Sequence, residues 1–146
     1  MPTIPYNHLI FNEFPVPRLT IICYNGSMNT SAKGRNAEQI AIDFLHRNGY
    51  AIIARNVHTS HAGELDVVAK KEKMLYFIEI KSSTRPEIAP EFNFTAQKQK
   101  HLLRAIQLYL LRNHLDVEHP WQLDLIAITL SDGQPMITHY PNILFA

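Results

Sequence analysis

Two short hydrophobic segments that carry charged residues constrain the fold of this chain more than any other feature. They are residues 63–69 (GELDVVA) and residues 75–81 (LYFIEIK), separated by KKEK and one methionine. Apolar runs of this length around a polar connection are typical of paired β-strands and predict an antiparallel hairpin. A charged side chain in a buried strand costs free energy unless it is paired or binds a metal. The charges in this hairpin therefore call for a partner.

The alternation of side chains along a strand predicts how these charges meet. Glu64 and Asp66 share one face of the first strand, and Glu79 and Lys81 share one face of the second. A tight turn at residues 72–73 would set Asp66 opposite Glu79. A four-residue loop would set Asp66 opposite Lys81 instead. In either register Asp66 and Glu79 lie on the same face.

Two carboxylates on neighbouring strands suggest a metal site. Directly opposed side chains have Cβ atoms about 5 Å apart, and two carboxylates at that distance repel unless a proton or a cation lies between them. Mg²⁺ or Mn²⁺ would suit such oxygen ligands. Lys81 would lean over the same point, and a metal beside an ammonium group is suited to hydrolysis of phosphate esters. The alternative is a salt-bridge cluster on an exposed sheet, but flanking residues such as Val67 and Ile78 favour strands covered on both sides.

The remaining patterns predict one mixed sheet with helices packed on it, in the order α-β-β-β-α-β-β, an α/β or α+β layer architecture. A helical stripe starts after Thr30 or Ser31 and stops at residues 48–49. A second helix starts after Thr95 and runs to about Asn113. The other predicted strands are residues 50–57, 121–130 and 136–140.

Several charged residues lie at the borders of the predicted helices. Glu38 lies at the edge of the first apolar stripe and Lys98 at the edge of the second, so both could face the sheet. Each could equally be a solvated residue on the flank of a helix.

Lys100, His101 and Arg104 form a basic patch on the outside of the second helix, which could contact phosphates or simply keep the helix soluble. Asp124 interrupts an apolar strand, and we expect it to pair with a cation inside the domain.

The first 29 residues differ from the rest and hold four of the nine prolines. We expect a poorly structured extension over residues 1–29, in which 19–24 could be a short strand, and a folded domain over 30–146. Translation from Met28 would place the start directly before the first helix, so the first 27 residues could be a mis-called start. Cys23 is the only cysteine and the net charge is +1. No apolar run is long enough to span a bilayer, and we expect a cytoplasmic protein that does not bind membranes.

The order of these motifs resembles the YraN family of bacterial proteins. The motifs are GxxAExxA at residues 34–41, GY, ARN, GELD, FIEIK, TxxKQxxL at 95–102 and LDLIAI. That family is similar to the PD-(D/E)xK nucleases, in particular the archaeal Holliday-junction resolvases. The resemblance implies a restriction-endonuclease-like αβββαβ core, here followed by a return strand.

The same resemblance implies roles for individual residues. Asp66, Glu79 and Lys81 match the catalytic motif, and Glu38 matches the helix acid that completes the metal site. Glu64 and Lys98 match positions of supporting role. The chain departs from the family before Asp124, where it has Gln122-Leu123 in place of a basic and an aromatic residue, and it has no proline before Asp66.

Together these features predict a Mg²⁺- or Mn²⁺-dependent endonuclease that acts on DNA, with branched or damaged DNA as candidate substrates. The metal ligands would be Asp66, Glu79 and, directly or through water, Glu38. Lys98, Lys100 and Arg104 would contact the nucleic acid. Action on two strands would need a homodimer. The alternative is a module on a nuclease-like scaffold that binds nucleic acid or protein without cleaving it.

Overall fold

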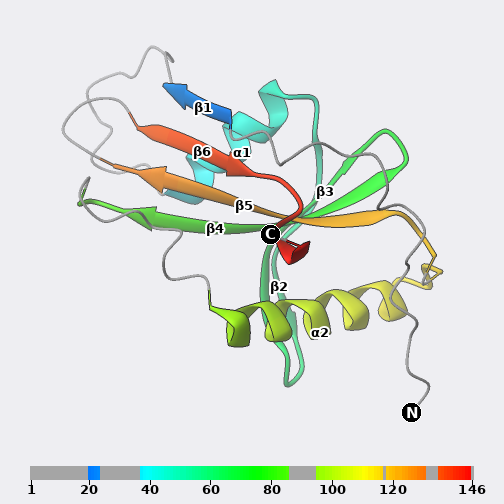
Figure 1. Cartoon of the computed structure of the whole chain (residues 1–146). Helices are drawn as coiled ribbons and strands as arrows, with labels where there is room; N and C mark the ends of the chain where they lie inside the picture. Colours follow the sequence, from blue (N-terminus) through cyan, green and yellow to red (C-terminus); the bar gives the residue numbers. More distant parts are fainter. Residues whose placement is uncertain (1–19, 24–36, 86–94, 117, 131–134, 146) are drawn as a thin grey trace.

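The chain folds around a six-stranded mixed sheet with the strand order β1-β6-β5-β4-β3-β2 (Figure 1). The computed structural model describes residues 20–23, 37–85, 95–116, 118–130 and 135–145. The strands are β1 (Thr20–Cys23), β2 (Ala51–Thr59), β3 (Gly63–Lys71), β4 (Met74–Ser83), β5 (Trp121–Thr129) and β6 (Met136–Tyr140), and the helices are α1 (Ala37–Arg47), α2 (Ala96–Arg112) and the 3₁₀ turn η3 (Ile143–Phe145).

One long helix covers each face of the sheet (Figure 1). The apolar stripe of α1 packs with Val67, Ile78 and other strand residues of one face. The stripe of α2 packs with Val68, Phe77 and their neighbours on the opposite face. The central strands are therefore buried on both sides, as their continuous apolar runs predicted. The predicted order of elements and the αβββαβ core with a return strand are confirmed.

The β3–β4 hairpin has the tight turn of the two predicted registers. Lys71 pairs with Met74 and the register continues to Val67 opposite Ile78, so the connection is the two-residue turn at 72–73. The next opposing positions in this register are Asp66 and Glu79. β4 also pairs in parallel with β5, and α2 is the crossover helix that connects these two strands in the chain. In this pairing Ile78 lies beside Asp124. The sheet thus fixes Asp66, Glu79 and Asp124 on three adjacent strands.

Toward its N-terminal end, β3 is paired with β4 only as far as Val67. It stays paired with β2 as far as Gly63, which lies opposite Thr59. The β2–β3 hairpin continues alongside α2 (Figure 1), and Leu65 and Val57 join the apolar cluster on that side. Asp66, which directly precedes Val67, is the residue of β3 next to the point where the pairing with β4 stops. The strand predicted over residues 50–57 extends to Thr59 in the structure.

The second helix begins as its sequence indicated. The Thr95 Oγ1 atom accepts a hydrogen bond from the Lys98 N–H at 3.2 Å and caps α2. This cap fixes the backbone of Lys98 in the first turn. The cap predicted for the first helix, Thr30 or Ser31, lies outside the described residues.

A short strand from the N-terminal region forms one edge of the sheet. Thr20–Cys23 pair antiparallel with β6, so this part of the expected extension is a strand and not loose chain. The rest of residues 1–29, including Met28, lies outside the described residues, and the domain limits remain a prediction. No helix in the described part of the chain is both long and apolar enough to cross a membrane.

Candidate metal and phosphate site

The candidate site lies where β3 separates from β4. The Ile80 N–H, which has lost its strand partner here, donates a hydrogen bond to Asp66 Oδ2 at 2.8 Å. The carboxylate of Asp66 thus takes the place of a backbone acceptor and is fixed next to Glu79. A side chain held by a backbone donor of a central strand is well oriented for a catalytic role.

Glu79 is the most deeply buried acid of the site, with 1% of its surface exposed. Its Oε1 atom lies 2.8 Å from the Nζ of Lys81 and 3.2 Å from the Nζ of Lys98. Its Oε2 atom is buried and has no hydrogen-bond partner among the described residues. Buried carboxylate oxygens are normally satisfied, so Oε2 has an acceptor capacity that the protein does not use.

The two carboxylates affect each other electrostatically. Burial and the neighbouring Glu79 carboxylate raise the pKa of Asp66 to about 6, against the opposing effects of the Ile80 N–H, Lys98 and Lys81. Ionising Asp66 therefore costs free energy in the folded protein. A cation between the two acids would remove that cost.

Glu38 reaches the site from the first turn of α1 and is held by strand β2. Its Oε1 atom accepts hydrogen bonds from Arg55 Nη2 at 2.8 Å, Arg55 Nε at 3.0 Å and Asn56 Nδ2 at 3.1 Å. Glu38 and Asp66 line one cavity of about 190 Å³, the Asp66 cavity. Its lining residues are Ala37, Glu38, Asn56, Asp66, Ile80 and Ser82.

The donor set fits a small divalent cation held mainly by Asp66 and Glu79. Mg²⁺ is usually bound through one or two carboxylates, with waters and substrate phosphates completing its octahedron. In the described ranges no group of three or more Asp, Glu, His or Cys side chains is close enough to hold a metal ion. The arrangement therefore does not bring Glu38 into a three-acid cluster, because Arg55 and Asn56 hold its Oε1. Glu38 was predicted to contact the metal directly or through water, and this arrangement favours the contact through water.

The predicted supporting residues lie on the α2 side of the site. Lys98, which contacts Glu79, also lines a second cavity of about 190 Å³ together with Glu64, His61 and His101. Glu64 Oε2 lies 3.9 Å from His58 Nδ1.

The predicted basic patch is accessible from solvent. Lys100 and Arg104 are exposed on α2, one helical turn apart. The contact of Lys100 and Arg104 with nucleic acid stays a prediction.

Asp124 is held by neighbouring groups inside the domain, and of these only the imidazole of His139 could be the predicted cation, when it is protonated. It is fully buried, and its Oδ2 lies 2.8 Å from His139 Nε2 on β6. Its Oδ1 accepts hydrogen bonds from Gln122 Nε2 at 2.7 Å and from the Asn142 N–H at 2.9 Å. Together with burial, which is the larger effect, this carboxylate raises the pKa of Tyr50 to about 12. Asp124 thus ties β5 to β6 and to the C-terminal turn.

Sequence reasoning missed Arg55 and Asn56 as members of the site. In the β2–β3 register Asn56 faces Asp66, between the pairs Arg55–Val67 and Val57–Leu65. Asn56 has a φ of 49° in the middle of a strand, a conformation that asparagine tolerates better than most residues. The ARN motif was the available signal, but its geometry depends on the approach of α1.

Comparison with known proteins identifies the chain's relatives. The model of Uncharacterised protein family UPF0102 matches residues 37–128, which include every candidate site residue. A UPF0102 protein of Syntrophotalea carbinolica is 40% identical over 112 residues, covering 75% of this chain and 88% of the relative. One of Nitratiruptor sp. is 40% identical over 95 residues, covering 65% and 80%. One of Geobacter metallireducens is 31% identical over 117 residues, covering 80% and 94%.

Proposed function

This chain belongs to the uncharacterised protein family UPF0102, the YraN family that its motifs resemble, and from its site we propose that it is a Mg²⁺- or Mn²⁺-dependent endonuclease. The substrate would be DNA, and the reaction hydrolysis of a phosphodiester bond. One observation carries the proposal: Glu79 is buried beside Asp66, with two lysines on one carboxylate oxygen and the other oxygen unsatisfied. Buried carboxylate oxygens are normally hydrogen-bonded, so an oxygen without a partner in the described part of the chain would be unusual in a purely structural salt bridge.

In the proposed hydrolysis, the acids of the site would bind the cation and the lysines would contact the water or the phosphate. Asp66 and Glu79 Oε2 would hold the cation, which when bound supplies Lewis-acid polarisation of the phosphate and an acidified water. Lys81 is held by Glu79 Oε1 on a central strand, so its ammonium group can donate hydrogen bonds to the attacking water or to the phosphate oxygens as their charge grows. Lys98 provides a second cation at the same carboxylate from α2.

The charge balance of the site supports a bound cation before a bound phosphate. The carboxylates of Glu38, Asp66 and Glu79 face the cations of Arg55, Lys81 and Lys98. These six groups balance when Asp66 is ionised, so the cluster alone attracts an anion weakly. A divalent cation would leave it with two excess positive charges, which suits a phosphodiester backbone.

Cleavage assays with purified protein test this proposal. Labelled linear, nicked, single-stranded and four-way-junction DNA should be tested with Mn²⁺ and Mg²⁺. We expect cleavage of at least one substrate by the wild type and a loss of at least a hundredfold in Asp66→Asn and Glu79→Gln. Asp116→Asn, an exposed acid beyond α2, is the matched control and should cut normally. No cleavage of any substrate, or full cleavage by Asp66→Asn, would refute the proposed endonuclease activity.

A binding module without chemistry is the alternative that the same assay separates. Such a module would bind DNA or a protein partner while none of the substrates is cut. Binding alone would not require two carboxylates and a lysine to be placed together in one partly buried cluster. The unsatisfied oxygen of Glu79 therefore favours the enzyme.

A further inference from the structure

Arg55 lies on strand β2, one side chain away from the Asp66 cavity. Its Nε and Nη2 atoms both donate to Glu38 Oε1, at 3.0 and 2.8 Å, and Glu38 lines the cavity. The Arg55 side chain is 41% exposed, while that of Glu38 is 19% exposed. The guanidinium group is thus fixed from the protein side and open on its solvent side.

Among the described residues, one edge of the guanidinium group has no hydrogen-bond partner. Guanidinium has five N–H donors arranged as a fork. The contacts with Glu38 use the edge formed by Nε and one N–H of Nη2. The other edge, formed by Nη1 and the second N–H of Nη2, has the spacing that matches two oxygens of a phosphate.

Two further features fix the position of this group. Asn56 donates to the same Glu38 oxygen at 3.1 Å, so the carboxylate is held from two neighbouring residues of β2. Asn56 itself has a φ of 49°. A strained backbone in the middle of a strand persists where the surrounding structure requires it, and such residues cluster at binding sites.

We propose that Arg55 is a phosphate-binding residue of this site, oriented by Glu38 and Asn56 to hold a DNA phosphate next to the one that is cut. The inference rests on the proposed function for the identity of the ligand. Because Arg55 does not line the Asp66 cavity itself, it would contact a neighbouring phosphate and not the one over Asp66 and Glu79. It is therefore a substrate-binding residue and takes no part in the proton transfers.

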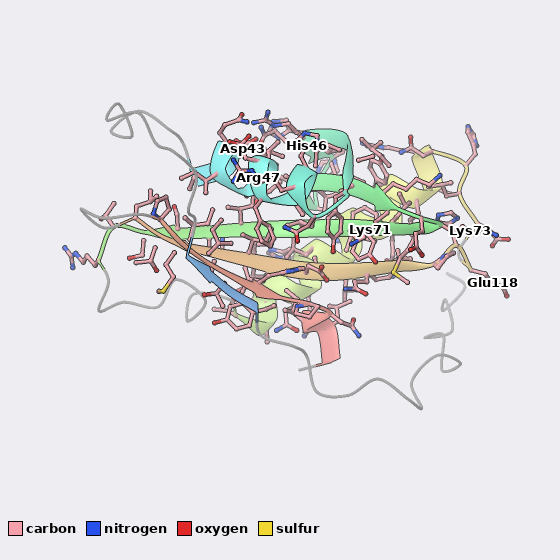
Figure 2. The ribbon with its side chains drawn as sticks, turned by 90° about the horizontal axis from the view of Figure 1, so that it is seen from above. Asp43, His46, Arg47, Lys71, Lys73 and Glu118 are labelled. Carbon is pink, nitrogen blue, oxygen red and sulfur yellow. The ribbon has the colours of Figure 1, made fainter. Side chains whose placement is uncertain are left out.

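The salt dependence of DNA binding tests this role without cleavage. Binding of a fluorescein-labelled DNA duplex is measured by anisotropy with Ca²⁺ in place of Mg²⁺, over a series of salt concentrations. Each phosphate contact contributes about 0.9 to the slope of log K against log salt for duplex DNA. Arg55→Gln should lower that slope by about 0.9, which is one contact. Arg47→Gln is the matched control, because Arg47 lies on the outer side of α1 (Figure 2) and in its last turn, and it should leave the slope unchanged.

A scan with single methylphosphonates identifies the phosphate concerned. Each substitution neutralises one phosphate of the duplex. We expect one position at which the wild type loses several-fold affinity and Arg55→Gln loses none, because the contact is already missing. Arg55→Lys, which keeps the charge and spares the fold, should keep the salt slope but bind more weakly, since it lacks the fork.

The outcomes separate this inference from the proposed function. If Arg55→Gln and the wild type respond alike at every methylphosphonate position, or Arg55→Lys binds as tightly as the wild type, Arg55 holds no phosphate. If the wild type cuts DNA while either of these results is found, the inference alone is wrong. If the wild type binds no DNA, both fail. A one-position difference in a protein that binds without cutting would support Arg55 as a phosphate-binding residue and refute the proposed cleavage.

Discussion

Replacing Asp66 by asparagine should stabilise the protein at pH 8, although the residue lies in the centre of the candidate site. The pKa of Asp66 is raised from 3.8 to about 6 by burial and by Glu79. An acid with a raised pKa binds its proton more tightly in the folded state, so stability falls as pH rises from about 4 to about 6. Above pH 7 the folded protein carries the full cost of ionising Asp66. Asparagine avoids this cost and can still accept the Ile80 N–H.

The size of the effect follows from the shift. About two pK units at about 1.4 kcal/mol each give an upper bound of about 3 kcal/mol. Asp66 is partly exposed, so solvent screening reduces the gain, and we expect about 1–2 kcal/mol at pH 8. Urea unfolding of the wild type and Asp66→Asn between pH 4.5 and 8 measures it. The gain should shrink as pH falls through 6, and Asp116→Asn should show none. Equal stability of Asp66→Asn and the wild type at pH 8, or a gain that grows toward pH 4.5, would refute this account of the carboxylate pair.

Three further predictions concern the same strands. Mn²⁺-dependent cleavage should fall as pH drops below about 6, because Asp66 must be ionised to hold a cation, and a pH–rate profile of the wild type measures this. A flat profile from pH 5 to 8 would contradict it. Glu79→Gln should abolish Mn²⁺ binding in calorimetry and cost about 1–3 kcal/mol in urea unfolding, because Lys81 and Lys98 lose their shared carboxylate; unchanged Mn²⁺ affinity would exclude Glu79 as a ligand. Asp124→Ala should cost about 3–5 kcal/mol in urea unfolding, because it leaves His139 and the partly buried donors of Gln122 and Asn142 without their partner. A loss below about 1 kcal/mol would mean that the contact with His139 on β6 is unimportant.

The strands and helices could be predicted because their patterns are local. The two-period alternation around Asp66 and Glu79 and the short connection between their strands allow two registers, and the structure has the one with the turn at residues 72–73. Lys98 could be identified as a candidate because it lies at the border of an apolar stripe, which is a local feature too.

The contacts that depend on tertiary placement could not be predicted. The sequence does not say that Lys81 and Lys98 share one oxygen of Glu79 while the other stays unsatisfied. The pair of Glu38 and Arg55 joins residues 17 positions apart, through the approach of α1 to an edge strand. The possible strand at residues 19–24 could be seen in the sequence, but its pairing with β6 joins distant segments and could not.

Figure 2 shows polar and charged residues on the outside of the molecule, away from the candidate site. Asp43, His46 and Arg47 lie on the side of α1 that faces away from the sheet, and Lys73 and Glu118 lie at the end of the molecule with the β3–β4 turn (Figure 2). These charged residues agree with the polar faces that the helical and hairpin patterns predict. They also show why charge alone does not identify the site. Glu79 differs from them because it is buried, and Asp66 differs because burial and the neighbouring Glu79 raise its pKa.

The proposed enzyme requires a cation between Asp66 and Glu79, and an anomalous difference map of crystals soaked in Mn²⁺ tests this most directly. We predict a peak about 2.0–2.2 Å from Glu79 Oε2 and from an oxygen of Asp66, with waters completing the octahedron. Glu38 should contact one of those waters. A map with no peak between the two carboxylates at saturating Mn²⁺, or with a peak only elsewhere on the protein, would contradict the account.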